Sequence, residues 1–220
     1  MRALLALSAV LLALGATAPI AAAQDPVIQI EFTNRQLDPW HWVLTLHPGG
    51  SGHFRSEMGM QPAGQPQQID TPDVNRDVHL SAAFAAHVFD IARRHNWFNE
   101  ECESHLKVAF QGWKKFSYRG PGGVGTCTFN YSKDKEIEEL GDSLQAVAQT
   151  ILEGERLEML LQHDRLGLDK ETEYLVDAAE SGRVQQLCAI RQILVQLAQD
   201  DEVLERVRKR ARLLLAQAGT

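Results

Sequence analysis

Apolar and polar residues alternate along much of the first half of the chain. Residues 28–32 and 40–46 carry a large apolar side chain at every second position. Residues 54–58 indicate a further strand after a turn of proline and glycine at 48–52. A period of two is typical of a strand that buries one face. We therefore predict three strands within residues 27–58.

A single helix separates these strands from a second alternating group. Between residues 80 and 91 apolar side chains recur every three or four positions, the spacing of an amphipathic helix. Residues 59–78, rich in proline and glutamine, are predicted to form an exposed loop before it. Alternation returns in residues 106–110, 116–118 and 127–131. The order β-β-β-α-β-β-β predicts an α+β fold in which the helix covers one face of an antiparallel sheet.

The second half of the chain has a helical pattern throughout. Beyond the last alternating run, apolar residues recur at intervals of three and four, with a change of phase at Gly154. Gly167 is predicted to end one helix and Asp169 to cap the next. Short links between amphipathic helices are typical of a small bundle. We predict an antiparallel α+β domain at residues 24–131, and a C-terminal helical bundle at 132–220 that packs on it or follows it.

Residues 1–23 have the layout of a secretory signal peptide. Arg2 precedes an apolar run, and alanines at 21–23 offer a small-residue cleavage site. The alternative is an uncleaved membrane anchor, but Pro19 and the small residues fit a cleavage region better. No later segment has the length and apolarity of a membrane span. We therefore predict a periplasmic or extracellular protein that has no transmembrane segment after signal cleavage.

The chain has three cysteines, and an oxidising compartment would allow two of them to pair. Cys102 and Cys127 are the favoured pair, because their disulfide would close a loop of about 25 residues and contribute about 3 kcal/mol. Cys188 lies on an apolar helical face, where an unpaired cysteine behaves as a small apolar residue. The alternative is that all three thiols are free and buried.

Charge and motifs narrow the classes of function. The formal net charge is -7, which argues against general nucleic-acid binding. The glycines at 120–125 match a phosphate-binding loop only in number, because strand patterns lie on both sides of them. The sequence contains no Gly-x-Ser-x-Gly, His-Glu-x-x-His or Ser-x-x-Lys signature with its partners. No cofactor and no catalytic residue is predicted.

Two aromatic and two imidazole side chains are the candidates for a ligand-binding groove. Trp40 and Trp42 alternate on one predicted strand, and His41 and His53 belong to the same sheet region. A strand that presents two tryptophans can line a groove, although packing in the core is the more common role of such residues. The histidines have no compact spacing of the kind that zinc sites use.

A second, weaker candidate is a cation site. Asp73, Asn75 and Asp77 have the alternating oxygen ligands that open a calcium loop. Val78 stands where the sharp turn of such a loop needs glycine, and Phe84 stands where its closing carboxylate should be. We therefore favour a polar loop over a metal site.

Three short motifs carry a resemblance to known proteins. They are residues 127–132 (CTFNYS), 164–169 (DRLGLD) and 205–208 (ERVR). With them, the chain from Thr126 to about Leu215 resembles uncharacterised secreted bacterial proteins. The resemblance implies a bacterial origin and an envelope or extracellular location. It implies no activity and no catalytic residue.

These observations favour a non-enzymatic envelope protein that binds a protein or peptide partner. The hypothesis rests on a well-patterned domain without a recognisable catalytic signature. The first alternative is a secreted hydrolase with its site on the sheet face, near Trp40, His41, Trp42 and His53. The second alternative is a carrier of a small ligand, which would require an enclosed apolar cavity.

Overall fold

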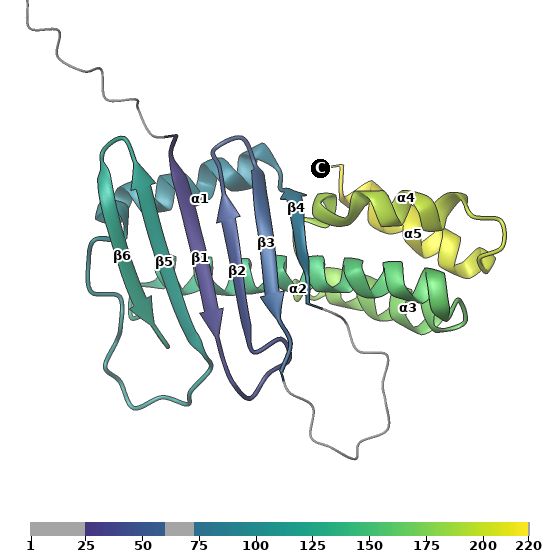
Figure 1. Cartoon of the computed structure of the whole chain (residues 1–220), viewed down its shortest axis with the longest axis horizontal. Coiled ribbons are helices and arrows are strands. Elements are labelled where there is room, and N and C mark those ends of the chain that lie inside the picture. Colours follow the sequence, from purple (N-terminus) through teal and green to yellow (C-terminus); the bar gives the residue numbers. More distant parts are fainter. Residues whose placement is uncertain (1–24, 60–72, 220) are drawn as a thin grey trace, which may run out of the picture.

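The computed structural model of the protein describes residues 25–59 and 73–219 (Figure 1). They form one antiparallel sheet followed by helices, which confirms the predicted α+β class. The strands are β1 (Val27–Thr33), β2 (His41–Leu46), β3 (Ser51–Glu57), β4 (Asn75–His79), β5 (Trp113–Gly120) and β6 (Gly123–Phe129). The α-helices are α1 (Ala82–Arg94), α2 (Lys135–His163), α3 (Gly167–Glu180), α4 (Arg191–Gln199) and α5 (Glu205–Gln217), and two short 3-10 helices are labelled η1 (Asn96–Phe98) and η2 (Leu187–Ile190).

The strands are ordered β4-β3-β2-β1-β5-β6, so β1 is central and β4 and β6 are the edges. The register places Ile30 of β1 opposite Leu44 of β2 and Phe116 of β5. Because side chains alternate along a strand, these apolar residues all lie on one face, where they are buried. In Figure 1, α1 and the first part of α2 pass behind that face.

A second apolar core lies beyond β4. The end of α2 packs there with α3, η2, α4 and α5, and we call this group the helical lobe (Figure 1). Ile151 of α2 belongs to the core under the sheet, whereas Leu157 of the same helix belongs to the lobe. Gly154 lies between them, and a Cβ atom there would come within 2.3 Å of Ile190 Cγ2. The change of phase at Gly154 therefore marks a close approach between α2 and η2.

The sheet contains a strand that the sequence did not reveal and lacks one that was expected. Residues 75–79, within the expected loop, form β4, whereas residues 106–110 form an exposed loop instead of a strand. Among the described residues, four strands therefore precede α1 and two follow it. Arg76 hides the strand pattern of β4, because this charged residue lies on the same face as the buried Val78. The charge of Arg76 is neutralised by Glu155 and Glu158 of α2. Sequence periodicity does not reveal this pairing.

The expected helix stop at Gly167 is also wrong, because α3 begins at this residue. Asp169 lies in the first turn of α3 and does not cap it. Its carboxylate instead accepts hydrogen bonds from Arg206 and Arg210 of α5. An acidic residue at this position also suits the dipole of the helix.

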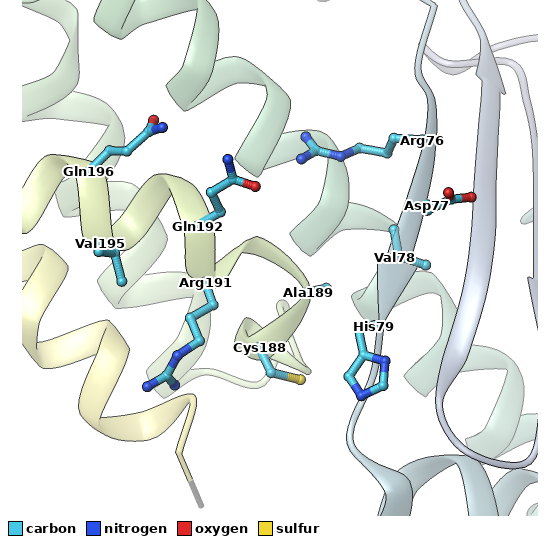
Figure 2. A pocket seen from close by; sticks show the side chains of 10 residues that line it. All are labelled: Arg76, Asp77, Val78, His79, Cys188, Ala189, Arg191, Gln192, Val195 and Gln196. Carbon is cyan, nitrogen blue, oxygen red and sulfur yellow. The ribbon is translucent and has the colours of Figure 1, made fainter.

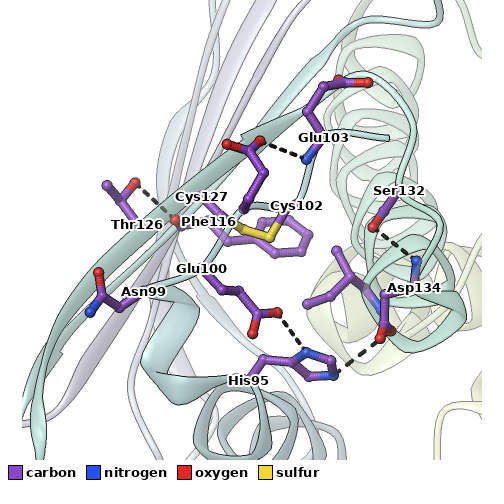
Figure 3. The surroundings of a disulfide bond; sticks show 12 residues. His95, Asn99, Glu100, Cys102, Glu103, Phe116, Thr126, Cys127, Ser132 and Asp134 are labelled. Carbon is purple, nitrogen blue, oxygen red and sulfur yellow. Dashed lines mark hydrogen bonds and ion pairs between the residues drawn. A yellow bond between two sulfur atoms is a disulfide. The ribbon is translucent and has the colours of Figure 1, made fainter. Parts of the chain in front are cut away.

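A disulfide joins Cys102, in the loop after η1, to Cys127 of β6 (Figure 3). The favoured cysteine pair is thus confirmed, and Cys188 is free. The predicted signal peptide lies outside the described residues, and the division into domains at residue 131 stays a prediction. Among the helices of the described part, none has both the length and the apolar composition needed to cross a membrane.

His95 ties the disulfide loop to the start of α2, and Figure 3 shows it between Glu100 and Asp134. Its Nδ1 lies 2.8 Å from Glu100, and its Nε2 lies 2.9 Å from Glu136. Burial lowers the pKa of His95, but hydrogen bonds to these two carboxylates outweigh it and raise the pKa. Arg94 and His95 in turn lower the pKa of Glu136 to about 2. These hydrogen bonds hold the loop to the helix.

Candidate functional site

The four residues of the predicted ligand groove do not come together. Trp42 is buried in the core and stacks on Phe32, with ring centroids 5.5 Å apart. Trp40 precedes β2 and is half-buried. His41 and His53 lie on the opposite, solvent-facing side of the sheet, where His41 contacts the carboxylates of Glu31 and Glu57. A shared site for all four is therefore not supported by this arrangement.

The two histidines are also separated along the strands. Thr45 of β2 lies opposite His53, four residues from His41 on the same strand. Strand geometry makes that separation about 13 Å. His53 Nδ1 lies 2.7 Å from Asp77 Oδ1, and Nε2 lies 2.7 Å from Asn75 Oδ1. The hydrogen bond to Asp77, followed by that to Asn75, raises the pKa of His53 and favours its doubly protonated form.

The three oxygen-bearing residues of the weak cation candidate have other partners. Asp73 accepts a hydrogen bond from the Met58 N–H, at 2.8 Å. Asn75 and Asp77 lie on β4 and bind the two ring nitrogens of His53. Within residues 25–59 and 73–219, no group of three or more His, Cys, Asp or Glu side chains is placed to hold a metal ion.

The most distinctive feature near these residues is the open edge of β4. Ser56 N–H donates to the Val74 carbonyl, and Leu80 N–H donates to the Gly50 carbonyl. Because bonded pairs alternate in an antiparallel ladder, the even-numbered residues of β4 bond to β3. The backbone groups of Asn75, Asp77 and His79 therefore point away from the sheet. They make no hydrogen bond to any described residue.

A groove of about 600 Å³ lies between this edge and α4 (Figure 2). That volume is within the range of about 300–1,000 Å³ that is typical of ligand sites. Its apolar lining comes from Val78 of β4, Ala189 of η2 and Val195 of α4. The groove is open to solvent, and the edge of β4 forms one wall along its length.

The β4 wall is held in place by ion pairs with α2. Nη1 of Arg76 lies 3.2 Å from Glu155 Oε2 and 2.9 Å from Glu158 Oε1. These two carboxylates neutralise the only charged side chain that β4 directs toward the helices. The position of β4 next to the lobe is thus fixed by contacts that do not occupy its outer edge.

The opposite wall of the groove, formed by η2 and α4, is held by hydrogen bonds to α2 and to the start of α1. Thr150 Oγ of α2 donates to the Gln185 carbonyl and accepts from the Gln185 N–H. Gln186 Oε1 accepts a hydrogen bond from Ser81 N–H at the start of α1. Together with the close approach at Gly154, these contacts fix η2 and α4 at a set distance from β4. The groove is therefore built into the fold.

The groove is also lined by the polar side chains of Arg191 and Cys188. Arg191 is exposed and makes no ion pair with any described residue. Cys188 is half-buried, and burial raises the pKa of its thiol, so it remains protonated and weakly nucleophilic. Sequence reasoning missed this groove because its walls are more than a hundred residues apart in the chain. The apolar helical face predicted around Cys188 was the only sequence feature that indicated one of these two walls.

No protein-family model matches this chain, and the curated proteins show no significant match to it. The resemblance to secreted bacterial proteins therefore does not establish a family. Functional inference rests on the geometry alone.

Proposed function

We propose that the protein is an exported, non-enzymatic module that binds an extended peptide segment by strand addition at β4. The observation that carries the proposal is the row of backbone groups on Asn75, Asp77 and His79 that faces a groove and makes no hydrogen bond to any described residue. An exposed strand edge is a template for another strand. A periplasmic or extracellular location is part of this proposal, and the disulfide is compatible with it.

The lobe favours a single strand as the occupant. Edges of sheets are usually protected because they pair with the sheets of other molecules. Here α4 lies across the groove from β4, so any sheet that paired with this edge would have to fit between β4 and the lobe (Figures 1 and 2). A single added strand would lie about 4.8 Å from β4 and needs less lateral space than a sheet.

The lining indicates which peptides fit. Side chains of an added strand would alternate between solvent and the groove. Those that enter the groove would contact Val78, Ala189 and Val195, which suit small or branched apolar residues. Arg191 lines the groove and makes no ion pair with any described residue, so a carboxylate on the peptide would add a favourable contact. We therefore expect extended peptides in which apolar residues alternate with polar ones, at least one of them acidic.

The affinity of such a site should be modest. Three outward-facing residues offer backbone donors and acceptors, and each hydrogen bond contributes about 0.5–1.5 kcal/mol net. Burial of a few apolar side chains adds to this, while ordering the peptide opposes it. Dissociation constants in the micromolar range follow.

A proline at the open edge tests the proposal. The N–H of Asp77 points away from β3, so Asp77→Pro removes an edge donor without breaking the ladder to β3. Asp77→Ala is the matched control, because it loses the same carboxylate but keeps the N–H. Phage-displayed random heptapeptides are selected on the wild-type protein, and the most enriched peptide is then measured by fluorescence polarisation. We expect Asp77→Pro to weaken its binding about tenfold or more and Asp77→Ala to retain it.

Two results would contradict strand addition. One is the enrichment of no peptide on the wild-type protein. The other is equal binding by Asp77→Pro and Asp77→Ala, which would place the peptide elsewhere. Circular dichroism of both variants establishes that they are folded.

The hydrolase and carrier alternatives have no specific observation in their favour. A hydrolytic site at His53 would need a nucleophile at Nε2, and that atom faces the amide oxygen of Asn75. A carrier would need an enclosed apolar cavity, whereas the groove beside β4 is open to solvent. Peptide binding is the function that the described geometry supports best.

A further inference from the structure

The open edge of β4 ends directly after His79. The odd-numbered residues of β4 face outward, and the next outward position along the chain is Ser81. Ser81 is still extended, with φ -63° and ψ 142°. Its N–H, however, donates to Gln186 Oε1 at 2.9 Å, and its carbonyl accepts from the Ala85 N–H at 3.0 Å. An added strand can therefore pair with this edge as far as His79 and no farther.

Gln186, which ends the edge, is fixed by the structure around it. Its φ of 58° lies in the left-handed region, which is disfavoured for a residue with a Cβ atom. The preceding Gln185 is bonded twice to Thr150 of α2. The Gln186 carbonyl accepts from the Ala189 N–H at 2.9 Å, and its Oε1 lies 3.7 Å from the thiol of Cys188. The helical lobe therefore determines where the edge of β4 stops.

The free charge at this end of the groove is positive. Figure 2 shows Arg191 and His79 near the same end of the groove, whereas Arg76 lies near the other. Arg191 is exposed and makes no ion pair with any described residue. Of the described residues that line the groove, only Asp77 is acidic, and its carboxylate lies 2.7 Å from His53 Nδ1 on the solvent-facing side of the sheet. An anionic group at this end would meet Arg191 without competition from another carboxylate of the lining.

We propose that the groove is specific for the free C-terminus of a peptide, whose terminal carboxylate binds at Arg191. The inference rests on the proposed strand addition at β4, and it names the class of peptide that is added. A peptide that runs parallel to β4, in the direction from Asn75 to His79, reaches this end with its C-terminus. Its carboxylate can accept hydrogen bonds from the Arg191 guanidinium and from the outward N–H of His79.

The same end of the groove disfavours the other ways in which a peptide could lie. An N-terminal ammonium group has the same sign of charge as Arg191, so it would be repelled. An antiparallel peptide would carry its carboxylate to the opposite end, near Glu155 and Glu158. A chain that continued past His79 would meet Gln186 and would have to leave the edge. A parallel peptide that ends at this point avoids all three costs.

Two libraries of random heptapeptides separate C-terminal specificity from strand addition itself. In one, the peptides are fused to the phage through their N-termini and end in a free carboxylate, whereas in the other they are fused through their C-termini. The most enriched peptide of the first library is synthesised as the acid, as the C-terminal amide, and with two glycines added after its last residue. Fluorescence polarisation measures the binding of each form to the disulfide-bonded protein.

The variant is Arg191→Gln, and Arg119→Gln is its matched control. Arg119 is likewise exposed and makes no ion pair with any described residue, but it lies on β5, away from the groove. We expect the acid to bind the wild-type protein about tenfold more tightly than the amide or the extended peptide, because a charged hydrogen bond is lost. Arg191→Gln should abolish this preference and Arg119→Gln should retain it. Circular dichroism establishes that both variants are folded.

A nitroxide label on the N-terminus of the acid peptide reports its direction by NMR. We expect the label to broaden the N–H signal of Asn75 more than that of His79. The inference is overturned if His79 is broadened more, or if Arg191→Gln keeps the preference for the acid. Equal binding of acid and amide, with both weakened by Asp77→Pro, would overturn C-terminal specificity and leave strand addition intact. Enrichment of no peptide from either library would overturn the proposed function and this inference together.

Discussion

The sheet region and the helical lobe are stabilised in different ways. Under the sheet, strands distant in sequence and η1 bring together large aromatic side chains such as Phe54, Phe98 and Phe116, and a disulfide closes one end. The described core of the lobe contains only aliphatic side chains, from helices that follow one another along the chain. Its surface carries ion pairs between neighbouring helices and loops: Arg165 with Glu202, Arg206 and Arg210 with Asp169, and Arg208 with Asp201.

The difference shows where a binding surface can arise in this fold. The sheet supplies a strand edge whose outward backbone groups make no hydrogen bond to any described residue, whereas a helix leaves such groups only at its two ends. The lobe supplies a wall that limits access to that edge. Neither region forms the groove alone, and α2 is the element that joins them, since it contributes to both cores.

Removing the disulfide is expected to have the largest effect on stability. The double variant Cys102→Ser, Cys127→Ser should lower the free energy of unfolding by about 3 kcal/mol. All four tryptophans lie in the sheet region, so their fluorescence reports on that region during urea unfolding, while circular dichroism reports mainly on the helices. If α2 couples the two regions, both signals shift together. A shift in fluorescence alone would show that the lobe unfolds independently. Cys188→Ser is the control, with an expected change below about 1 kcal/mol.

Gly154→Ala tests the junction between the regions. Alanine normally stabilises a helix relative to glycine by about 1 kcal/mol. Here the new Cβ would come within 2.3 Å of Ile190 Cγ2, so we expect a net loss of about 1–2 kcal/mol from overpacking. The loss should shrink when Ile190 is also replaced by alanine, and chemical denaturation of the four proteins in this cycle measures the coupling. A stabilising Gly154→Ala would contradict the close approach.

The sequence predicted the local elements of both regions better than their contacts. Periodicity found β1, β2 and most of α1 and α2, because each of these has one continuous apolar face. It missed β4, where Arg76 interrupts the buried face. It also assigned a strand to 106–110, where the alternation belongs to an exposed arm held by Asn130 and the disulfide.

Sequence patterns could not predict the candidate site at the β4 edge. Unpaired backbone groups leave no mark on side-chain periodicity, and the groove requires that α4 stands beside β4. Of the predicted site residues, Asn75, Asp77 and His53 do meet, at the edge strand, where they form a hydrogen-bonded set.

Glu153 makes the contact between α2 and α3 dependent on pH. It is buried between α2 and α3 beside Glu171, and its Oε2 makes no hydrogen bond in the described structure. Burial, together with Glu171, raises the pKa of Glu153 from 4.5 to about 8. A group whose pKa is raised by folding stabilises the protein fully below its unfolded pKa. That contribution is lost as the pH rises from 4.5 through 8.

Glu153→Gln should remove this pH dependence. Its amide cannot ionise and can donate to Glu171. We expect Glu153→Gln to raise the unfolding free energy most near pH 8.5 and hardly at all near pH 4.5, measured by urea denaturation. Glu171→Gln is the matched control, because it loses the ion pair to Arg156, whose Nε lies 2.8 Å from Glu171 Oε2. A gain that does not vary with pH would contradict a buried, protonated Glu153.

The central claim is that β4 offers an open edge to an extended peptide, and amide hydrogen exchange measured by NMR tests it most directly. In the free protein, the N–H groups of Asp77 and His79 should exchange fast, while those of Arg76 and Val78, which bond to β3, should be protected. Addition of the selected peptide should slow exchange at Asp77 and His79 and leave Arg76 and Val78 unchanged. Protection of Asp77 and His79 before any peptide is added would contradict the claim, because the edge would then already be occupied.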